Sequence, residues 1–172
     1  MKNIFYFITC CFFCFSTTLF SQEKKANTKS LQEDIHLLLN NWHKAAATAN
    51  YDTYFNSMDS HAVFVGTDAS EVWSKEAFEK FSKPYFDKGK AWSFLALDRN
   101  IYLHTSEKIA WFDEVLDTWM GVCRGSGVVE MIDGNWKIKH YVLSVAVPNE
   151  DIKAVIEAKK EKDSLFIQKL KH

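Results

Sequence analysis

The hydrophobic pattern divides the chain into a helical first part, a β-rich second part and a helical end. From Leu31 onward, apolar residues recur every three or four positions, which is typical of one face of a helix. These residues are Leu31, Ile35, Leu38, Leu39, Trp42, Ala45, Ala46 and Ala49. Ser30, with Glu33 three residues later, has the spacing of a capping box and predicts that the helix begins there. A short helix around Tyr54 and a longer one capped by Ser74 are expected next.

Strand-like runs dominate the middle of the chain. Two short strands, 61–65 and 71–73, lie on either side of a turn at 66–68, and a longer strand is expected over 91–104. The stretch 109–150 holds three further long runs, separated by two turn signals. This stretch also carries most of the side chains that could do chemistry.

The second turn in this stretch fixes a pairing register. Asp133-Gly134 between apolar runs predicts a two-residue hairpin turn, because both residues can adopt positive φ. An uninterrupted ladder then pairs Gly127 with His140 and puts His140 on the core face, beside space that glycine leaves open. The outer face would carry Tyr141, Leu143 and Val145.

The first turn, within 117–122, leaves two registers open. One puts Glu114 on the core face, and a one-residue slip puts Asp113 and Asp117 there instead. Either register brings a carboxylate near His140.

Helices followed by a large antiparallel sheet are typical of an α+β fold. The sheet strands are apolar on both faces, so we expect helices to cover one face and a second copy of the chain to cover the other. The domain is expected to span residues 30–149, and a helical tail, 150–172, to follow. Mixed lysines and acids favour a solvated helix with one packed face, and the alternatives are a helix that lies on a membrane or meets a partner.

The first residues have the features of a signal peptide. Lys2 precedes an apolar run that ends in small or polar residues near Ser21, which predicts removal of residues 1–21 and export to the periplasm or the medium. A polar lead-in, 22–29, would then begin the mature chain. Lipid attachment to a cysteine of this segment is the alternative. Of the four cysteines only Cys123 lies outside it, so we expect no intramolecular disulfide.

Composition excludes several classes of partner and cofactor. The 172 residues carry a net charge of −1 and only two arginines, without a basic stripe, so nucleic acid is not an expected partner. A membrane is not expected as a partner after signal cleavage. His36 and His43 lack the i, i+4 spacing of metal ligands on one helix. We therefore expect neither a metal nor another cofactor.

Several short motifs between Leu31 and Glu150 support a family resemblance. They are Phe64-Val65-Gly66-Thr67-Asp68 before Trp73, Lys83-Pro84-Tyr85-Phe86, Ala110-Trp111-Phe112-Asp113-Glu114, Cys123-Arg124-Gly125-Ser126-Gly127-Val128, and Trp136-Lys137-Ile138 before Val147-Pro148-Asn149. Together they resemble the nuclear transport factor 2-like superfamily, in its SnoaL-like, ketosteroid-isomerase-like branch. The resemblance implies a cone-shaped α+β fold, with a curved antiparallel sheet wrapped over N-terminal helices. It also implies an internal cavity and a dimer formed through the sheet. It does not imply an enzyme, because one fold hosts many functions.

Three functions follow from these expectations. The first is an exported protein whose cavity binds a small apolar or aromatic molecule. The second is a proton-transfer enzyme of isomerase or cyclase type, and the third is a non-catalytic dimeric interaction module. The candidate catalytic residues are Asp113, Glu114 and His140. The candidate ligand-binding residues are Tyr54, Trp73, Trp111, Arg124 and Gly127.

Each candidate also has a structural interpretation. His140 could be a core histidine, Arg124 could form a structural or interface ion pair, and the tryptophans could be core residues. Ketosteroid isomerases use an aspartate base with a tyrosine and a protonated aspartic acid. Tyr54 and Asp113 are of suitable type for these roles, but their positions do not match a motif.

Overall fold

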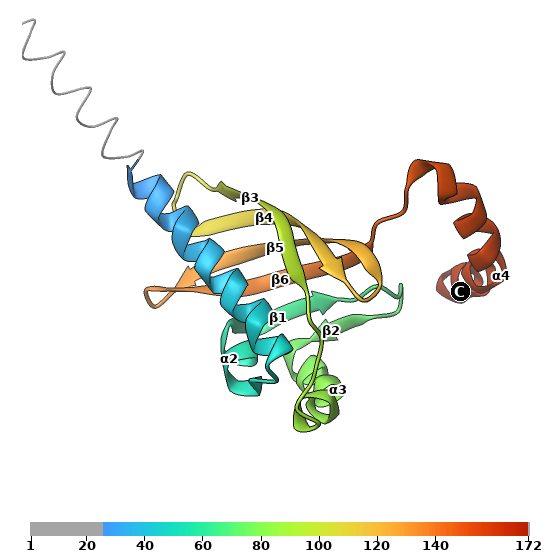
Figure 1. Ribbon diagram of the computed structural model, residues 1–172, viewed down its shortest axis with the longest axis horizontal. Helices are drawn as coiled ribbons and strands as arrows, with labels where there is room; N and C mark the ends of the chain where they lie inside the picture. The colour runs from blue at the N-terminus through green and yellow to red at the C-terminus, as the bar shows by residue number, and fades with distance from the viewer. Residues whose placement is uncertain (1–25, 172) are drawn as a thin grey trace, which may run out of the picture.

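The computed structural model describes residues 26–171, which form a curved sheet with helices on one side and a separate C-terminal helix (Figure 1). The helical elements are a first helix over 26–47, α2 (Tyr51–Asn56), α3 (Lys75–Asp87), the short 3-10 helix η1 (Asn149–Asp151) and α4 (Ile152–Leu170). The strands are β1 (Met58–Val65), β2 (Val72–Ser74), β3 (Leu95–Leu103), β4 (Ile109–Thr118), β5 (Gly121–Ile132) and β6 (Asn135–Val145). The predicted signal peptide, 1–21, lies outside the described residues.

The six strands form one sheet in the order β2-β1-β6-β5-β4-β3. This confirms the α+β fold with a curved sheet over N-terminal helices, but the sheet is mixed and not wholly antiparallel. β1 runs parallel to β6, whereas every other neighbouring pair is antiparallel. No tight turn joins β1 to β6, so hairpin geometry does not set their relative direction.

The first helix buries the face that its apolar spacing predicts. Ile35, Leu39 and Trp42 are almost completely buried. The predicted start at Ser30 is wrong, because the chain is already helical from residue 26. Ser30 therefore lies inside the helix, where backbone N–H groups are already bonded to carbonyls four residues earlier and need no cap.

Both hairpin turns lie where the sequence predicts them. Thr118 pairs with Gly121, whose φ is 84°. At the second turn Asp133 and Gly134 both have positive φ, 49° and 78°. The first register places Glu114 on the inner face, so the alternative left open by the sequence is settled in its favour.

A β-bulge in β6 overturns the predicted pairing of Gly127 with His140. The ladder follows the prediction as far as Val129 with Ile138, and the next pair is Val128 with His140. One extra residue on β6 reverses which face each later side chain occupies. Gly127 pairs with Tyr141, and His140 lies on the outer face. Tyr141 and Leu143, predicted on the outer face, are buried in the core.

The open space expected above Gly127 is filled. An added Cβ at Gly127 would lie 2.8 Å from Cζ of Phe112 and would also meet the backbone oxygen of His140. Phe112 is itself buried. The glycine makes room for this ring, so no ligand space lies at this position.

The C-terminal helix α4 stands off the domain (Figure 1). Within α4, all of whose residues the structure describes, no side chain is fully buried. Val155, Asp163 and Phe166 are half-buried, so the expected packed face exists only in part. Among residues 26–171, no helix combines the length and apolar character needed to cross a membrane.

Replacing Gly127 with valine should destabilise the protein. The new side chain would collide with the Phe112 ring and a backbone oxygen, and overpacking of this kind costs about 1–3 kcal/mol. Denaturant melts of Gly127→Val and wild type measure the difference. Ser126→Val, on the half-buried outer face of the same strand, is the control and should change stability little. Equal or higher stability of Gly127→Val would contradict the packing described here.

Candidate functional site

Glu114 is the polar centre of the interior. Its side chain is fully buried, and both carboxylate oxygens are occupied. Oε2 accepts from Nε of Arg99 at 2.8 Å and lies 2.7 Å from Nη2 of the same guanidinium. Oε1 lies 2.8 Å from Nε2 of His43 and accepts from the hydroxyl of Tyr141 at 2.8 Å. We refer to Glu114, Arg99, His43 and Tyr141 as the Glu114 cluster.

Four separate elements bring this cluster together. Arg99 lies on β3 directly opposite Glu114 on β4, His43 comes from the first helix and Tyr141 from β6. Glu114 pairs on its other side with Gly125 of β5. An added Cβ at Gly125 would lie 2.8 Å from Oε1 of Glu114 and would also collide with the Tyr141 hydroxyl. Glycine at this position therefore provides the space in which the carboxylate and the phenol meet.

Arg99 also forms hydrogen bonds to the first helix. Nη1 of Arg99 donates to Oδ1 of Asn40 at 2.8 Å and to the backbone oxygen of His36 at 3.3 Å. The guanidinium thus links the first helix to β3 and β4. Its planar set of donors suits a buried position shared among several acceptors.

The surroundings of Glu114 keep it ionised at neutral pH. Burial raises the pKa of Glu114, but the hydrogen bond from His43 and the charges of His43 and Arg99 lower it more, so the net shift of the pKa is downward. Burial, followed by the neighbouring Glu114 charge, raises the pKa of Tyr141 well above its usual value. The phenol therefore remains a donor and the carboxylate an acceptor.

Aromatic rings enclose the cluster. Trp42 stacks on Tyr54 with ring centres 4.9 Å apart and meets Tyr141 edge-on at 4.7 Å. Trp92 packs edge-on against Tyr54 at 5.5 Å, and Phe94 lies 6.2 Å from His43. Trp92 and Phe94 belong to the irregular segment 88–94 between α3 and β3. This segment therefore covers one side of the interior.

Two buried polar atoms beside the cluster lack a partner. Within residues 26–171, neither Nε1 of Trp42 nor the hydroxyl of Tyr54 makes a hydrogen bond. The pKa of Tyr54 is raised well above its usual value, chiefly by burial; the Trp92 indole, a nearby donor, opposes this shift but does not reach hydrogen-bond geometry. A buried polar group without a partner costs about 1–3 kcal/mol. Two further buried side-chain atoms within residues 26–171 also lack a hydrogen bond: Nε1 of Trp136, and Nη2 of Arg99, which is nevertheless ion-paired with Glu114 at 2.7 Å. Beside the cluster, Nε1 of Trp42 and the Tyr54 hydroxyl are thus the buried atoms with neither a hydrogen bond nor an ion pair.

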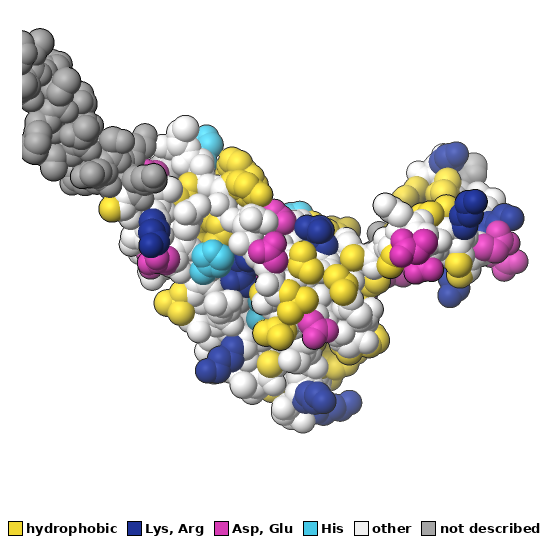
Figure 2. Space-filling model, turned by 45° about the horizontal axis from the view of Figure 1, so that its top comes forward, with side chains coloured by type: hydrophobic (Ala, Val, Ile, Leu, Met, Phe, Trp, Pro, Cys, Tyr) yellow, Lys and Arg dark blue, Asp and Glu magenta, His cyan; other side chains and the backbone are white. Residues whose placement is uncertain are grey.

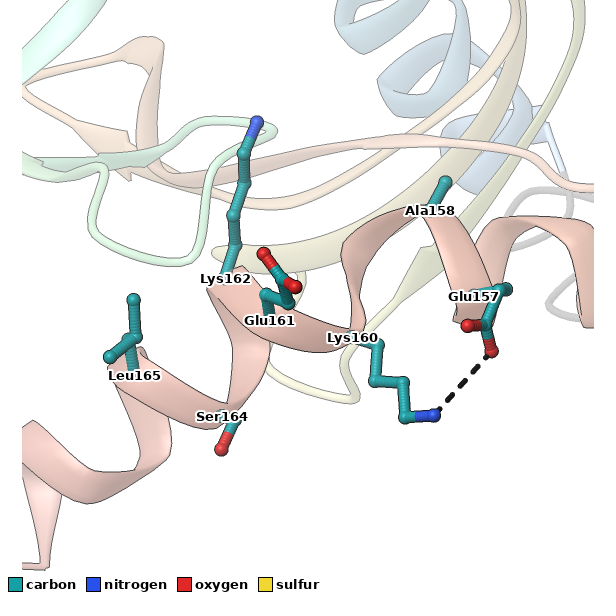
Figure 3. A pocket seen from close by; sticks show the side chains of 7 residues that line it. All are labelled: Glu157, Ala158, Lys160, Glu161, Lys162, Ser164 and Leu165. Carbon is teal, nitrogen blue, oxygen red and sulfur yellow. Dashed lines mark ion pairs between the residues drawn. The ribbon is translucent and has the colours of Figure 1, made fainter.

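Three hollows in the surface of residues 26–171 lie away from this interior. One runs along α4 (Figure 3), a second lies between the first helix, α2 and the β5–β6 turn, and a third lies between the β1–β2 loop and α4. None of these three is lined by a member of the Glu114 cluster. The cluster is closed off by packed side chains.

The predicted meeting of a carboxylate with His140 is wrong. The bulge in β6 turns His140 to the outer face, and Glu114 meets His43 instead. Asp113 also lies on the outer face, 3.3 Å from Nη1 of Arg124, and its other oxygen accepts from the Tyr102 hydroxyl at 3.4 Å. Of the three predicted catalytic residues, only Glu114 faces the interior.

The predicted ligand-binding residues divide between the two faces of the sheet. Tyr54 is buried beside the cluster, and Gly127 contacts Phe112 in the core. Trp111 lies on the outer face and is 48% exposed. Arg124 lies on the same face, in its partly exposed ion pair with Asp113. Trp73 is half-buried and stacks on Phe81 at 4.9 Å. The structure therefore does not gather these residues into one site.

Sequence reasoning missed three of the four residues of the cluster. His43 follows Leu39 by four positions and precedes Ala46 by three, so helical spacing places it on the buried face. Arg99 is one of only two arginines and lies within a predicted strand. Tyr141 was expected on the outer face, and the unpredicted bulge in β6 places it in the core.

The described residues offer no ready metal site. Within 26–171, no group of three or more histidine, cysteine, aspartate or glutamate side chains is close enough to hold a metal ion.

Comparison with known proteins places the fold. The profile of the SnoaL-like domain matches residues 35–148. No curated protein matches the sequence significantly. A provisionally assigned scytalone dehydratase from Novosphingobium aromaticivorans superposes with a TM-score of 0.60 at 12% identity, over 72% of this chain and 89% of that one. A nuclear transport factor 2-like protein from Cytophaga hutchinsonii gives 0.57 at 15% identity, over 67% and 98%. A third, of unknown function, from Pseudomonas putida gives 0.55 at 14% identity, over 72% and 91%. At these identities the likeness shows the fold alone.

Replacing Glu114 with glutamine should destabilise the protein strongly. It leaves the buried Arg99 charge without its counter-ion, and breaking a buried pair in this way costs about 3–5 kcal/mol. Asp113→Asn, one residue away, breaks an ion pair that is partly exposed and should cost less than about 1 kcal/mol. Denaturant melts at pH 7 measure both variants. Similar losses in the two would contradict a structural role specific to Glu114.

The difference between wild type and Glu114→Gln should also depend on pH. The folded pKa of Glu114 lies below its usual value of 4.5, so its contribution is present above that value and lost as pH falls through the folded pKa. The two stability curves should therefore converge on acidification. A constant gap down to low pH would contradict the assigned direction.

Proposed function

The chain belongs to the SnoaL-like domain family, and we propose that it binds a small aromatic molecule in its interior, between the first helix and the sheet. The observation that carries the proposal is the pair of unpartnered polar atoms, Nε1 of Trp42 and the hydroxyl of Tyr54, beside the Glu114 cluster. A core selected for stability alone would replace such groups with apolar ones, because orphaned polar atoms are destabilising.

The surrounding rings favour a flat, largely apolar ligand. Trp42, Tyr54, Trp92 and Tyr141 meet at ring separations between 4.7 and 5.5 Å. Aromatic walls with a few fixed polar groups are typical of small-molecule sites. An acceptor atom on the ligand, such as a carbonyl or phenolic oxygen, would satisfy the indole N–H of Trp42 or the hydroxyl of Tyr54.

The electrostatics support binding more than proton transfer. A general base works best with a pKa near the operating pH. The pKa of Glu114 is shifted downward, away from that range, and both oxygens are already occupied. The ion pair with Arg99 would instead give the ligand a fixed polar boundary. His140, the proposed acid of the enzymatic alternative, faces away.

Entry would require movement of the segment 88–94. Trp92 and Phe94 of this segment pack onto Tyr54 and His43, and the segment has no regular secondary structure up to β3. Covering segments that open on the microsecond-to-millisecond scale commonly admit ligands. The dehydratase named for the neighbour from Novosphingobium aromaticivorans supports, by analogy of fold, a small-molecule site in such an interior.

We also propose that the mature chain is exported and forms a homodimer through the outer face of the sheet. The features of residues 1–21 motivate export. Tyr102 and Trp111 lie stacked on the outer face with ring centres 6.0 Å apart, 45% and 48% exposed. Exposed aromatic side chains with Val128 beside them on the next strand are typical of a contact surface.

Two matched tyrosine variants test the interior site. Tyr54→Phe removes a hydroxyl without a partner, so stability should stay equal or rise by up to about 1 kcal/mol. Tyr141→Phe removes a donor to a charged carboxylate and should lose about 1.5–3 kcal/mol. Binding of one- and two-ring aromatic carbonyls and phenols is followed by tryptophan fluorescence. The wild type should bind at least one such compound and Tyr54→Phe should bind it more weakly. Absence of binding across the panel, or equal binding by Tyr54→Phe, would refute the proposal.

Native mass spectrometry of protein exported from a bacterial host tests assembly and processing together. The expected species is a dimer of a chain that begins near Gln22. Trp111→Glu places a charge in the proposed contact and should abolish the dimer formed through the sheet at the low protein concentration of this measurement, whereas the exposed Tyr85→Glu on α3 should leave that dimer intact. A monomeric wild type would exclude the dimer, and a retained Met1 would exclude cleavage.

A further inference from the structure

The C-terminal helix carries a repeat that the domain does not explain. Residues spaced alternately by four and three positions lie along one side of α4, and this is the spacing of a coiled-coil seam. They are Ile152, Ile156, Lys159, Asp163, Phe166 and Leu170. We call these six residues the α4 seam. The matched family region ends at residue 148, so the seam is an addition outside it.

The α4 seam is symmetric about position 161. When two copies of the helix lie antiparallel and centred there, Ile152 faces Leu170 of the other copy, and Ile156 faces Phe166. Lys159 then faces Asp163 of the other copy, and Asp163 faces its Lys159. Every contact thus joins two apolar side chains or two opposite charges. Self-complementarity of this kind is what a two-fold symmetric contact requires.

We propose that α4 pairs antiparallel with α4 of a second copy of this chain. The apolar ends of the seam are available, since Ile152, Ile156 and Leu170 are 46%, 57% and 70% exposed. Lys159 and Asp163 are about half exposed and pair within the helix at 3.4 Å. In the pair of helices the same two charges would exchange partners across the seam. The polar pair at the centre fixes the register, as buried polar residues do in coiled coils.

The domain does not seal the α4 seam. A hollow of about 500 Å³ separates the middle of α4 from the β1–β2 loop and the end of β6. Lys159, Asp163 and Phe166 line this hollow, and Phe166 remains only half-buried. Contact with the chain's own domain therefore leaves the apolar side of the helix largely unpacked.

The other side of α4 is suited to solvent. Helical spacing places Glu157 and Glu161 opposite the seam. Figure 3 shows Glu157 joined by an ion pair to Lys160, at 3.7 Å. Figure 2 shows charged and hydrophobic side chains next to each other on this helix, away from the domain. Lys160 and Lys162 flank the seam near its midpoint, and in the pair each lies near the same residue of the other copy. This repulsion makes the contact weak and concentration-dependent.

Charge reversal on each side of the seam gives a test by mixing. Lys159→Asp makes the centre of the seam wholly acidic, and Asp163→Lys makes it wholly basic. Each variant alone should associate about tenfold more weakly than the parent, because both central contacts become repulsive. An equimolar mixture should regain the association of the parent, because acidic and basic seams are then complementary.

The measurement is sedimentation velocity of the full mature chain over a concentration series. All chains carry Trp111→Glu, so that contact through the sheet does not contribute to the association measured. Glu161→Lys makes the same change of charge as Asp163→Lys at a position off the seam, and should leave association unchanged. Recovery in the mixture cannot come from repair of the ion pair within one helix, since neither variant regains it.

Two results would overturn the proposal. The first is a parent chain, in this background, that remains monomeric up to high micromolar concentration. The second is a mixture that sediments as its separate components. In either case α4 is a solvated appendage of a single chain. These outcomes do not bear on the interior binding site, whose test uses different residues.

Discussion

The ion pair between Glu114 and Arg99 lies in the interior, and the rest of the domain has to accommodate its charges. A carboxylate and a guanidinium removed from water are tolerated only when their remaining hydrogen-bonding positions are satisfied. Here the satisfaction comes from elements that are far apart in sequence: the first helix provides His43 and Asn40, and β6 provides Tyr141. The arrangement also requires a glycine at Gly125. The position of the first helix on the sheet is thus fixed by charge as well as by apolar packing.

Local signals in the sequence predicted most of the fold. The turn at Asp133-Gly134, the glycine turn before β5 and the helix capped by Ser74 have short-range chemistry, and each is present in the structure. The parallel pairing of β1 with β6 has no such signal, because it joins segments about 80 residues apart along the chain. Its consequence, a mixed sheet, could not be read from hydrophobic alternation alone.

The candidate site was predicted less well than the fold, for a specific reason. One extra residue in β6, at Lys139, reverses the faces of all side chains after it. A sequence pattern with mixed apolar and polar residues on both faces does not reveal such an insertion. Prediction therefore placed His140 inside and Tyr141 outside. The choice between Asp113 and Glu114 depended on the register of β4 against β5, which residue type alone does not determine.

The strand order has a consequence for how the chain folds. β6 is the last strand to be synthesised, yet it lies in the middle of the sheet, between β1 and β5. Until it inserts, β1 with β2 and the β3–β5 meander have no shared edge, and neither Tyr141 nor its bond to Glu114 is available. Pairings between distant segments also form slowly, because the intervening chain loses conformational entropy before the new contacts stabilise the structure. A nascent chain would therefore keep its sheet in two separate parts, with the charges of Glu114 and Arg99 not yet enclosed by Tyr141, until β6 had been made.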